Sequence, residues 1–579
     1  MKHRAIHSTR HDEDGVALLS VIGITLLVLT LAGIAFTLSL EAQRQSVDYS
    51  NYNASLAAAD AGLDDYLARL NRVPGYYTTF NEGNPGDNDA LDGWADVPSS
   101  PGEYHVDVDA SQVNATGTVT VRSTGRFNGE ARTVETTFRP DGFLDFIYFT
   151  EYEILDPAAF GNPVAACNRY SYDGRSDAQC GIIRFVTGDT IQGPFHTNDA
   201  MVIDGDPTFT GEATTSYPGT DGVASPDECD GTPAGNRLFR ASEFGYTSNP
   251  DFQQGLCFAA ALPVPLDNQS IQDQTTNAGP STQGCSYYGP TYIEFYDPSP
   301  APNDGRMRVK SPWSANGAPG GAIPTAPYCG GADLGTAAGA DIAIPPNGVI
   351  YVDDDTGESC TNNRSGHPLN LPRPLDDSFY DCDIGDVFVW GTVDGQVTIG
   401  AQNNINIVWD VVYSDDFPDT DDLLGLVSNN NVQIYHPWDE SLPKADENLD
   451  VWGTYSGNNI APFIPGRTPG TMMGATTNTF EDPMVHAAIM AVRHSFRVQN
   501  FRQGARFTGD LSIRGAIAQF YRGAVGTSGG GGGSGYIKDY VYDDRLKFLS
   551  PPYFVQPGGE TTWKAKTWAE LVPPDDLPA

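Results

Sequence analysis

The sequence predicts a mainly β protein that begins with one long transmembrane α-helix. An uncharged apolar run, 16–40, is long enough to cross a bilayer at ~1.5 Å per residue. Further along the chain, short segments rich in Val and Ile alternate with Gly, Asn and Asp, as strands and turns do. Glycine (63) and proline (42) are abundant among the 579 residues, which favours a turn-rich architecture.

The predicted helix continues past the apolar run. From 41 to 72 the only glycine or proline is Gly62. Large apolar residues recur every seven positions, at Leu56, Leu63 and Leu70. This spacing places them in one stripe, so we predict a single helix over 16–73 with its transmembrane part at 16–40.

The residues before the apolar run predict its orientation. Lys2, Arg4 and Arg10 precede it, and basic residues favour the cytoplasmic side of a membrane. The run is also longer than the apolar core of a secretory signal peptide. We therefore expect a single-pass protein with a cytoplasmic N-terminus and an extracytoplasmic remainder.

Two motifs carry a family resemblance. Gly15 is followed by Val16-Ala17-Leu18-Leu19, and LAAADAGLDDYL spans Leu56 to Leu67. Together with the long helix they resemble the N-terminal region of PilX-type minor pilins, over roughly residues 10–140. The resemblance implies that a prepilin peptidase cleaves between Gly15 and Val16 and removes the leader, 1–15. It also implies other pilin subunits as partners and a surface filament as the final location.

Ser20 departs from the pattern of the major pilins. It occupies the fifth position after the predicted cleavage, where major pilins carry glutamate. A carboxylate inside a bilayer is costly and needs a partner, so serine removes that interaction. By this resemblance we expect a minor or tip subunit.

A small pilin-like α+β head is expected at 74–141. Within 103–139, three short segments alternate apolar and polar residues around turns, which predicts neighbouring antiparallel strands. The preceding segment, 74–102, is rich in Pro, Gly, Asn and Asp and reads as a loop.

The region 142–550 is expected to form one large β body. Its repeated strand–turn units favour a β-solenoid of the parallel β-helix type, while their irregular length leaves a Greek-key β-sandwich open. Asn403-Asn404 and Asn429–Asn431 are expected at turns or in stacked polar ladders. The region resembles the long β-rich C-terminal regions of some PilX-like proteins. The tail, 551–579, is expected to cap the solenoid through Trp563 and Trp568.

All eight cysteines lie in the stretch 167–382, which we expect to form loops inserted in the body. An even number in an exported protein predicts disulfides. Eight cysteines allow 105 pairings. Our prediction is sequential pairing: Cys167–Cys180, Cys229–Cys257, Cys285–Cys329 and Cys360–Cys382.

The charge balance excludes some partners and suggests one ligand. Lys+Arg 33 against Asp+Glu 74 gives a formal charge of −41, which disfavours nucleic acid and anionic lipid surfaces. The acids most suited to calcium are Asp353, Asp354, Asp355 and Glu358. Their spacing is not that of an EF-hand, so a solvated acidic loop remains the alternative.

No catalytic motif stands out, and we expect no enzyme activity and no other cofactor. His196, His486 and His494 lack metal-ligand spacing, and Gly526-Thr527-Ser528-Gly529-Gly530 matches G-x-S-x-G only at the edge of a glycine run. The expected function is a minor pilin-like subunit that displays a large β domain for adhesion or assembly priming. The alternative is a membrane-anchored β-helix that binds or acts on envelope polysaccharide.

Overall fold

The computed structural model describes two compact units. We call the head the unit formed by Met1–Ala110, Thr120–Phe138 and Thr567–Ala579, and the body the unit formed by Ser111–Val119 and Arg139–Lys566. The described residues are 14–73, 75–80, 84–111, 113–219, 237–241, 248–276, 284–298, 305–315, 327–336, 338–355, 383–415, 421–435, 482–499, 501–502, 510–527, 534–557, 562–575 and 577–578. The leader residues 1–13 and the linker 528–533 lie outside them.

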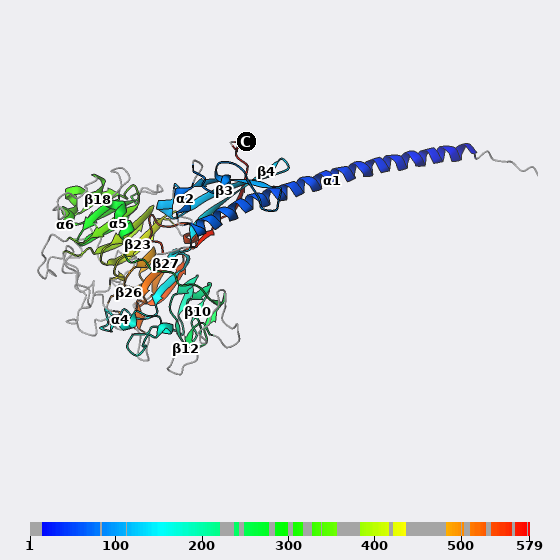
Figure 1. Ribbon diagram of the computed structural model, residues 1–579. Coiled ribbons are helices and arrows are strands. Elements are labelled where there is room, and N and C mark those ends of the chain that lie inside the picture. The colour runs from blue at the N-terminus through cyan, green and yellow to red at the C-terminus, as the bar shows by residue number, and fades with distance from the viewer. Residues whose placement is uncertain are drawn as a thin grey trace, which may run out of the picture. The chain divides into compact units, whose positions relative to one another are not determined.

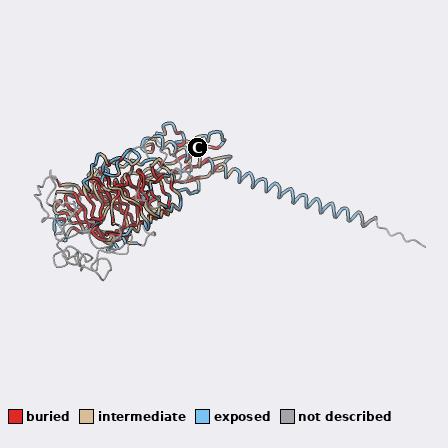
Figure 2. Tube along the Cα trace, turned by 90° about the horizontal axis from the view of Figure 1, so that it is seen from below, coloured by how far each residue is buried: buried red, intermediate tan, exposed pale blue. Residues whose placement is uncertain are grey.

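A single helix, α1 (Asp14–Arg72), confirms the long predicted helix (Figure 1). Over 18–40 the helix carries no charged residue and is exposed, with Leu19 72% and Phe36 66% exposed (Figure 2). Among the described residues it is the one helix long and apolar enough to span a membrane, with a mean hydropathy of 2.5 over 18 residues. An exposed apolar helix of this length fits a single-pass membrane anchor.

The second half of α1 packs on an antiparallel sheet in the head. The sheet runs β1 (Ala95–Asp96), β2 (Glu103–Asp109), β3 (Val119–Phe127) and β4 (Glu130–Pro140). The three strands predicted within 103–139 are thereby confirmed. Two short helices, α2 (Tyr76–Thr79) and η1 (Asp89–Leu91), connect α1 to the sheet.

Small residues set the distance between α1 and the sheet. A Cβ on Gly125 of β3 would lie 2.2 Å from the backbone nitrogen of Ala59. A Cβ on Gly62 would lie 2.3 Å from the Oγ of Ser123. Leu63, on the predicted apolar stripe, is buried against the sheet. The small residues of LAAADAGL therefore allow an approach that larger side chains would prevent.

The C-terminal segment completes the head sheet. Its strand β32 (Ala569–Leu571) pairs antiparallel with β4. The indole of Trp568 donates to the carboxylate of Asp60 on α1, at 3.0 Å, where the sequence had suggested a cap on the body. The larger part of the body, Arg139–Lys566, is thus inserted in the chain between two adjacent strands of the head.

One long parallel ladder runs through the body. Neighbouring strands in it are joined by parallel pairing throughout. In spatial order they are β15 (Cys285–Tyr288), β19 (Val349–Asp353), β21 (Gln396–Ala401), β23 (Leu423–Ser428), β25 (Met484–Ala491), β27 (Asp510–Tyr521), β5 (Tyr148–Tyr152), β8 (Phe195–Thr197), β11 (Ala213–Thr215) and β14 (Leu256–Phe258).

The spatial order of this ladder differs from the chain order. The chain enters at β5, proceeds to β14, and resumes at β15 on the far side of the ladder. It then returns strand by strand until β27 pairs with β5, so that Ile517 lies beside Tyr148. The two halves of the body therefore meet in the middle of one continuous ladder.

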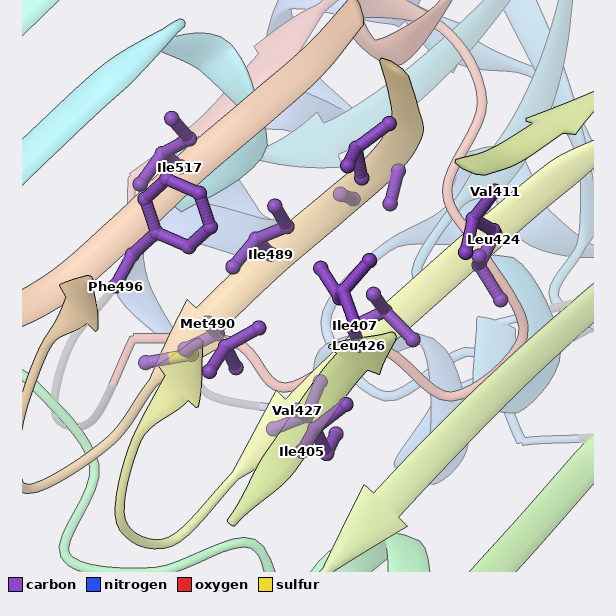
Figure 3. Close-up of a cluster of buried hydrophobic side chains, with 14 of the residues drawn as sticks. Ile405, Ile407, Val411, Leu424, Leu426, Val427, Ile489, Met490, Phe496 and Ile517 are labelled. Atoms are coloured by element: carbon purple, nitrogen blue, oxygen red, sulfur yellow. The ribbon is translucent and has the colours of Figure 1, made fainter. Parts of the chain in front are cut away.

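Residues at equivalent positions stack into a buried column along the ladder. Figure 3 shows part of this interior around Leu426, Ile489 and Ile517. The full column is Cys285, Ile350, Ile399, Leu426, Ile489, Ile517, Tyr148, Phe195, Ala213 and Leu256, and every member is buried. Burial of apolar side chains at about 25 cal/mol per Å² is the main stabilisation of such a core.

A second set of parallel strands runs alongside the first. It comprises β16 (Thr291–Tyr296), β20 (Val387–Val393), β22 (Ile405–Tyr413), β24 (Val432–Ile434) and β26 (Phe496–Val498). From β27 a further parallel series continues through β30 (Ile537–Tyr542), β7 (Thr190–Gln192), β10 (Thr208–Phe209) and β13 (Asp251–Phe252). The antiparallel strands β17 (Arg306–Lys310) and β18 (Ala340–Ala343) extend β16. The prediction of a mainly β protein is confirmed.

The remaining strands are short. They are β6 (Arg184–Val186), β9 (Val202–Asp204), β12 (Arg240–Ala241), β28 (Gly526–Thr527), β29 (Ser534–Gly535) and β31 (Trp563–Ala565). The strands β6, β9 and β12 form a small parallel sheet, and β28 pairs antiparallel with β29.

Asparagine side chains stack at the turns between strands. They form the polar ladder that was one of the two arrangements predicted from the sequence. The amide of Asn431 donates to the side-chain oxygen of Asn404 at 3.1 Å, and Asn430 donates likewise to Asn403. Asn404 in turn donates to the carboxylate of Asp386 at 3.2 Å. These bonds satisfy buried polar groups that a turn would otherwise leave unpaired.

A connecting segment, 259–276, runs along the ladder, and we call it the strap. It ends in helix α5 (Gln269–Thr276) and links β14 to β15. From one end to the other its contacts pass from Asn198 through Arg493 and Asn429 to Asp353. The strap thereby ties successive strands of the ladder together.

Two predicted disulfides form. Cys167 is bonded to Cys180, and Cys285 to Cys329. Cys257 is also disulfide-bonded, while Cys229, Cys360 and Cys382 lie outside the described residues. The helix α4 (Val164–Cys167) ends at the first cysteine of the Cys167–Cys180 bridge.

Candidate functional site

The residues predicted for processing lie at the start of α1. Gly15 and Val16 are in its first turn, since the helix begins at Asp14. Ser20 lies one turn further along and is exposed. Cleavage between Gly15 and Val16 stays a prediction.

The predicted calcium ligands do not converge among the described residues. Asp353 accepts a hydrogen bond from Gln272 at 2.6 Å, and Asp354 accepts one from the backbone of Gly385 at 2.8 Å. Burial raises the pKa of both carboxyls. Asp355 is buried, and Glu358 lies outside the described residues. Over the described part of the chain no group of three or more acidic, His or Cys side chains is placed to hold a metal, so calcium binding stays a prediction.

The three histidines have structural partners. His196 bonds Thr214 at 2.8 Å and Asn198 at 2.9 Å, and burial lowers its pKa to about 4. His486 accepts from the backbone of Tyr413 at 3.2 Å, and its pKa is also lowered by burial to about 4. His494 pairs with Asp156 at 2.5 Å. His196 and His486 are thus neutral at pH 7.

Acidic residues gather where two neighbouring parallel strands end. Glu153 follows β5, and Asp199 follows β8, two strands whose Thr150 and Thr197 are in register. Side chains that follow adjacent parallel strands meet at the same edge of a sheet, so these acids lie together. The backbone of Glu153 donates to Asp199 at 3.1 Å.

Two of these acids are neutralised by buried arginines. Arg522 contacts the carboxylate of Glu153 at 3.1 Å and lies 3.6 Å from the ring centroid of Phe185. Arg175 is fully buried and pairs with Asp199. Because each charge is matched at close range, both pairs serve as structural ion pairs.

Glu151 is the acid without such a partner. Its carboxylate accepts from the hydroxyl of Tyr170 at 2.6 Å and from the amide of Asn198. Burial is the largest influence on it and raises its pKa. Glu151 is therefore a buried carboxyl that is held by hydrogen bonds and that has no ion-pair partner among the described residues.

A file of aromatic rings covers this cluster. Tyr152 lies 5.3 Å from Tyr170, Tyr170 lies 5.1 Å from Tyr172, and Tyr172 lies 6.1 Å from Tyr217, measured between ring centroids. Phe520 extends the file beyond Tyr152, at 5.2 Å. Tyr172 is the most open member, with 37% of its surface exposed.

The first disulfide positions part of this file. The Cys167–Cys180 bridge closes a loop that carries Tyr170, Tyr172 and Arg175. The hydroxyl of Tyr172 donates to the backbone oxygen of Asn198 at 3.0 Å, which holds the loop against the end of β8. Closing a loop of this size restricts the unfolded chain and stabilises the folded one by about 3 kcal/mol.

Several buried polar atoms beside the rings have no hydrogen-bond partner. They are the Nη2 of Arg175 and the hydroxyls of Ser171 and Ser216, while the Nε of Arg175 forms an ion pair with an oxygen of Asp177 at 3.6 Å. A buried polar atom without a partner costs about 1–3 kcal/mol, and such a group marks a site that a ligand or water can complete.

The cluster combines aromatic rings with acidic side chains, of which two are ion-paired. Here Glu153 and Asp199 are held by arginines, which leaves Glu151 as the carboxyl that is not ion-paired. Aromatic faces with flanking hydrogen-bonding groups suit recognition of a small polar ring.

The sequence analysis did not identify this cluster. The signal was present as two tyrosines and an arginine between Cys167 and Cys180, in YSYDGR. What the sequence did not show was that β8 and β11 lie beside β5 and bring Asn198, Asp199 and Tyr217 to the same place.

Comparisons with known proteins give little further identification. No protein-family model matches the chain. No curated protein matches it either. A search of solved structures finds the competence-associated pilin ComZ from Thermus thermophilus, at 11% identity and a TM-score of 0.27, covering 90% of this chain and 98% of that chain. A TM-score this low supports no argument about fold or function.

Proposed function

We propose that this chain is a minor pilin-like subunit of a type IV pilus or pseudopilus. The observation that carries the proposal is the continuity of α1. One unbroken helix is apolar and exposed over 18–40, and it is packed against an antiparallel sheet over 55–70. The exposed part begins beside the predicted cleavage motif at Gly15, and the packed part contains LAAADAGLDDYL. Each part of the helix therefore carries one of the two PilX-like motifs.

The exposed apolar part of α1, 18–40, needs an apolar environment in every state of the protein. A bilayer supplies it before assembly, and helices of neighbouring subunits supply it in a filament. Since the same helix forms part of the head, a force that extracts it from the membrane moves the head with it. The proposed location is the membrane first, with the N-terminus cytoplasmic, and the cell surface after assembly.

Ser20 supports a minor position in the filament. It places a neutral hydroxyl where the resemblance expects the glutamate of a major subunit. Without that carboxylate, α1 has no charge to pair with a neighbouring N-terminal amine inside the apolar layer.

We propose further that the body is a parallel β-helix displayed for adhesion or assembly priming, without catalysis. The ten-strand parallel ladder and its buried column support the β-helix. Stacking of equivalent residues on successive coils is the property that defines a solenoid. A Greek-key sandwich would instead be built from antiparallel pairs.

The mature N-terminus tests the proposal. Mass spectrometry of the protein from membranes and from sheared surface fractions should find a peptide that begins at Val16, methylated or not. A peptide that retains Met1 would contradict processing and leave a plain membrane-anchored protein. A cut near Ala42 would identify a secreted body instead.

A matched pair of variants tests the cleavage site itself. Gly15→Arg should block processing and remove the protein from surface fractions. Gly23→Ala is the control, because a Cβ at Gly23 meets no atom within 4 Å and the residue lies beyond the cleavage site. Normal processing of Gly15→Arg would show that the pilin interpretation is wrong.

A further inference from the structure

We propose that the aromatic file beside Glu151 is a binding site for a neutral polysaccharide. The site comprises Tyr152, Tyr170, Tyr172, Tyr217, Phe520, Glu151, Arg175, Ser171 and Ser216. It lies wholly in the body, so the proposal does not depend on cleavage or filament assembly.

The rings supply an extended apolar surface. From Phe520 to Tyr217 the successive centroid distances are 5.2, 5.3, 5.1 and 6.1 Å. The file runs from Phe520 in β27 to Tyr217 just beyond β11, and Tyr172 is its exposed member while the other rings are partly buried. The CH faces of sugar rings pack on aromatic side chains, and a file of several rings suits a chain of sugars better than one small molecule.

The polar atoms beside the rings suit hydroxyl groups. Arg175 offers its buried Nη2, which has no hydrogen-bond partner, while its Nε forms an ion pair with an oxygen of Asp177 at 3.6 Å. The hydroxyls of Ser171 and Ser216 can each donate and accept, and they too have no partner. A sugar carries both donors and acceptors on each ring, so it can complete this mixed set.

The charge of the site and of the chain selects a neutral glycan. Arg175 is already matched by Asp199 and Asp177, and the buried Glu151 adds one further acidic group to the cluster. The whole chain has a formal charge of −41. Long-range repulsion therefore slows and weakens the approach of a polyanion, such as a uronic acid polymer.

The proposal is tested by calorimetric titration of the full-length chain in detergent. The probes are cellohexaose, maltohexaose and chitohexaose, with hexagalacturonate as the anionic comparison. At least one neutral hexasaccharide should bind saturably, and hexagalacturonate should bind at least tenfold more weakly. Absence of saturable binding to all three neutral probes would overturn the proposal, and so would tighter binding of hexagalacturonate, which would indicate a polyanion site.

Substitutions in the file separate stacking from folding. Tyr172→Ala should raise the Kd at least tenfold, while Tyr172→Phe, which keeps the ring, should raise it less than threefold. Tyr49→Ala is the matched control, because Tyr49 is an exposed tyrosine on α1, in the head. An equal loss of affinity in Tyr49→Ala would contradict the assignment.

Ser216→Ala distinguishes a ligand contact from a structural one. The Ser216 hydroxyl has no partner in the protein, so its removal should leave the unfolding temperature unchanged or slightly higher. If a sugar bonds this hydroxyl, the same variant should weaken binding about threefold to tenfold. Unchanged affinity in both Ser216→Ala and Ser171→Ala would show that these hydroxyls do not bond the ligand and would contradict the proposed polar contacts.

Discussion

Among single residues, Asp386 shows how a buried turn creates a pH dependence. Its carboxyl is fully buried, and one oxygen accepts from Asn403 and from both nitrogens of Asn404. The other oxygen has no partner. Burial is the largest influence and raises the pKa of Asp386 to about 7. The folded protein therefore holds this proton more tightly than the unfolded chain does.

The sign of the effect follows from linkage. A raised carboxyl pKa gives stability that is complete below the unfolded value, near 4, and is lost as the pH rises to about 7. Asp386→Asn keeps an acceptor oxygen but cannot ionise, so it should be more stable than the wild type at pH 8, by about 1–2 kcal/mol. At pH 4 the difference should vanish.

Chemical unfolding at pH 4 and pH 8 checks this expectation. Asp544→Asn is the control, because that carboxylate is 79% exposed and its replacement should change stability little at either pH. Equal stability of Asp386→Asn and the wild type at pH 8 would show that the carboxylate is solvated in the folded state.

The sequence predicted some of these residue-level contacts and missed others. Runs of asparagine such as Asn429–Asn431 suggested ladders because asparagine at successive turns can bond its neighbour, and that prediction was correct. The partners of Asp386 and Glu151 depend on strands far away in the chain. No local pattern encodes them.

Among the elements, α1 and β3 can pack closely because Gly125 has no side chain. Gly125→Ala would place a Cβ 2.2 Å from backbone atoms of Ser55 and Ala59, so the helix must move. We expect a loss of about 1–3 kcal/mol in the head. Gly93→Ala is the control, since its nearest atom would lie 3.4 Å away.

Hydrogen exchange of the β3 amides measures this effect locally. Exchange should speed up in Gly125→Ala and stay unchanged in Gly93→Ala. Unchanged exchange in Gly125→Ala would mean that α1 is not seated on β3 as the structure describes.

The strap depends on one buried side chain, Asn268. Its amide donates to the backbone oxygens of Ala401 and Val427, each at 3.0 Å, and its oxygen accepts from Tyr351 at 3.0 Å. Asn268→Ala should lower the free energy of unfolding by about 2–4 kcal/mol, because it leaves buried polar atoms unpaired. Gln269→Ala, at the neighbouring exposed position, should have little effect, and denaturant midpoints compare the two.

Whether these elements could be predicted depends on whether their contacts are local or distant in the sequence. The helix 16–73 and the strands of 103–139 were predictable because their patterns are local and regular. The strap was not, because a polar segment of this kind has no period, and its role is evident only from the strands that it crosses.

At the scale of the whole molecule, the order of the strands along the chain differs from their order in the ladder. Strand–turn units were predictable from the sequence, but the seam between β27 and β5 joins residues more than 350 positions apart. The C-terminal tail was expected to cap the body through Trp563 and Trp568. The pairing of β32 with β4 shows that the tail returns to the head instead.

This insertion makes the head depend on both ends of the chain. The tail supplies β32, the indole of Trp568 bonds Asp60, and the backbone oxygen of Pro578 accepts from Trp94 at 2.8 Å. Truncation after Lys566 removes all three contacts from the head and none of the strands of the long ladder in the body. Calorimetry should therefore show the unfolding transition of the head lowered by about 5–10 °C, with that of the body unchanged.

The body variant Asn268→Ala provides the opposite control for the same experiment. It should lower the transition of the body and leave that of the head in place, because Asn268 contacts only residues of the body in the bonds described above. Two transitions that respond separately would establish two folding units joined by an insertion. A single transition that shifts with either change would mean that the head and the body unfold as one cooperative unit.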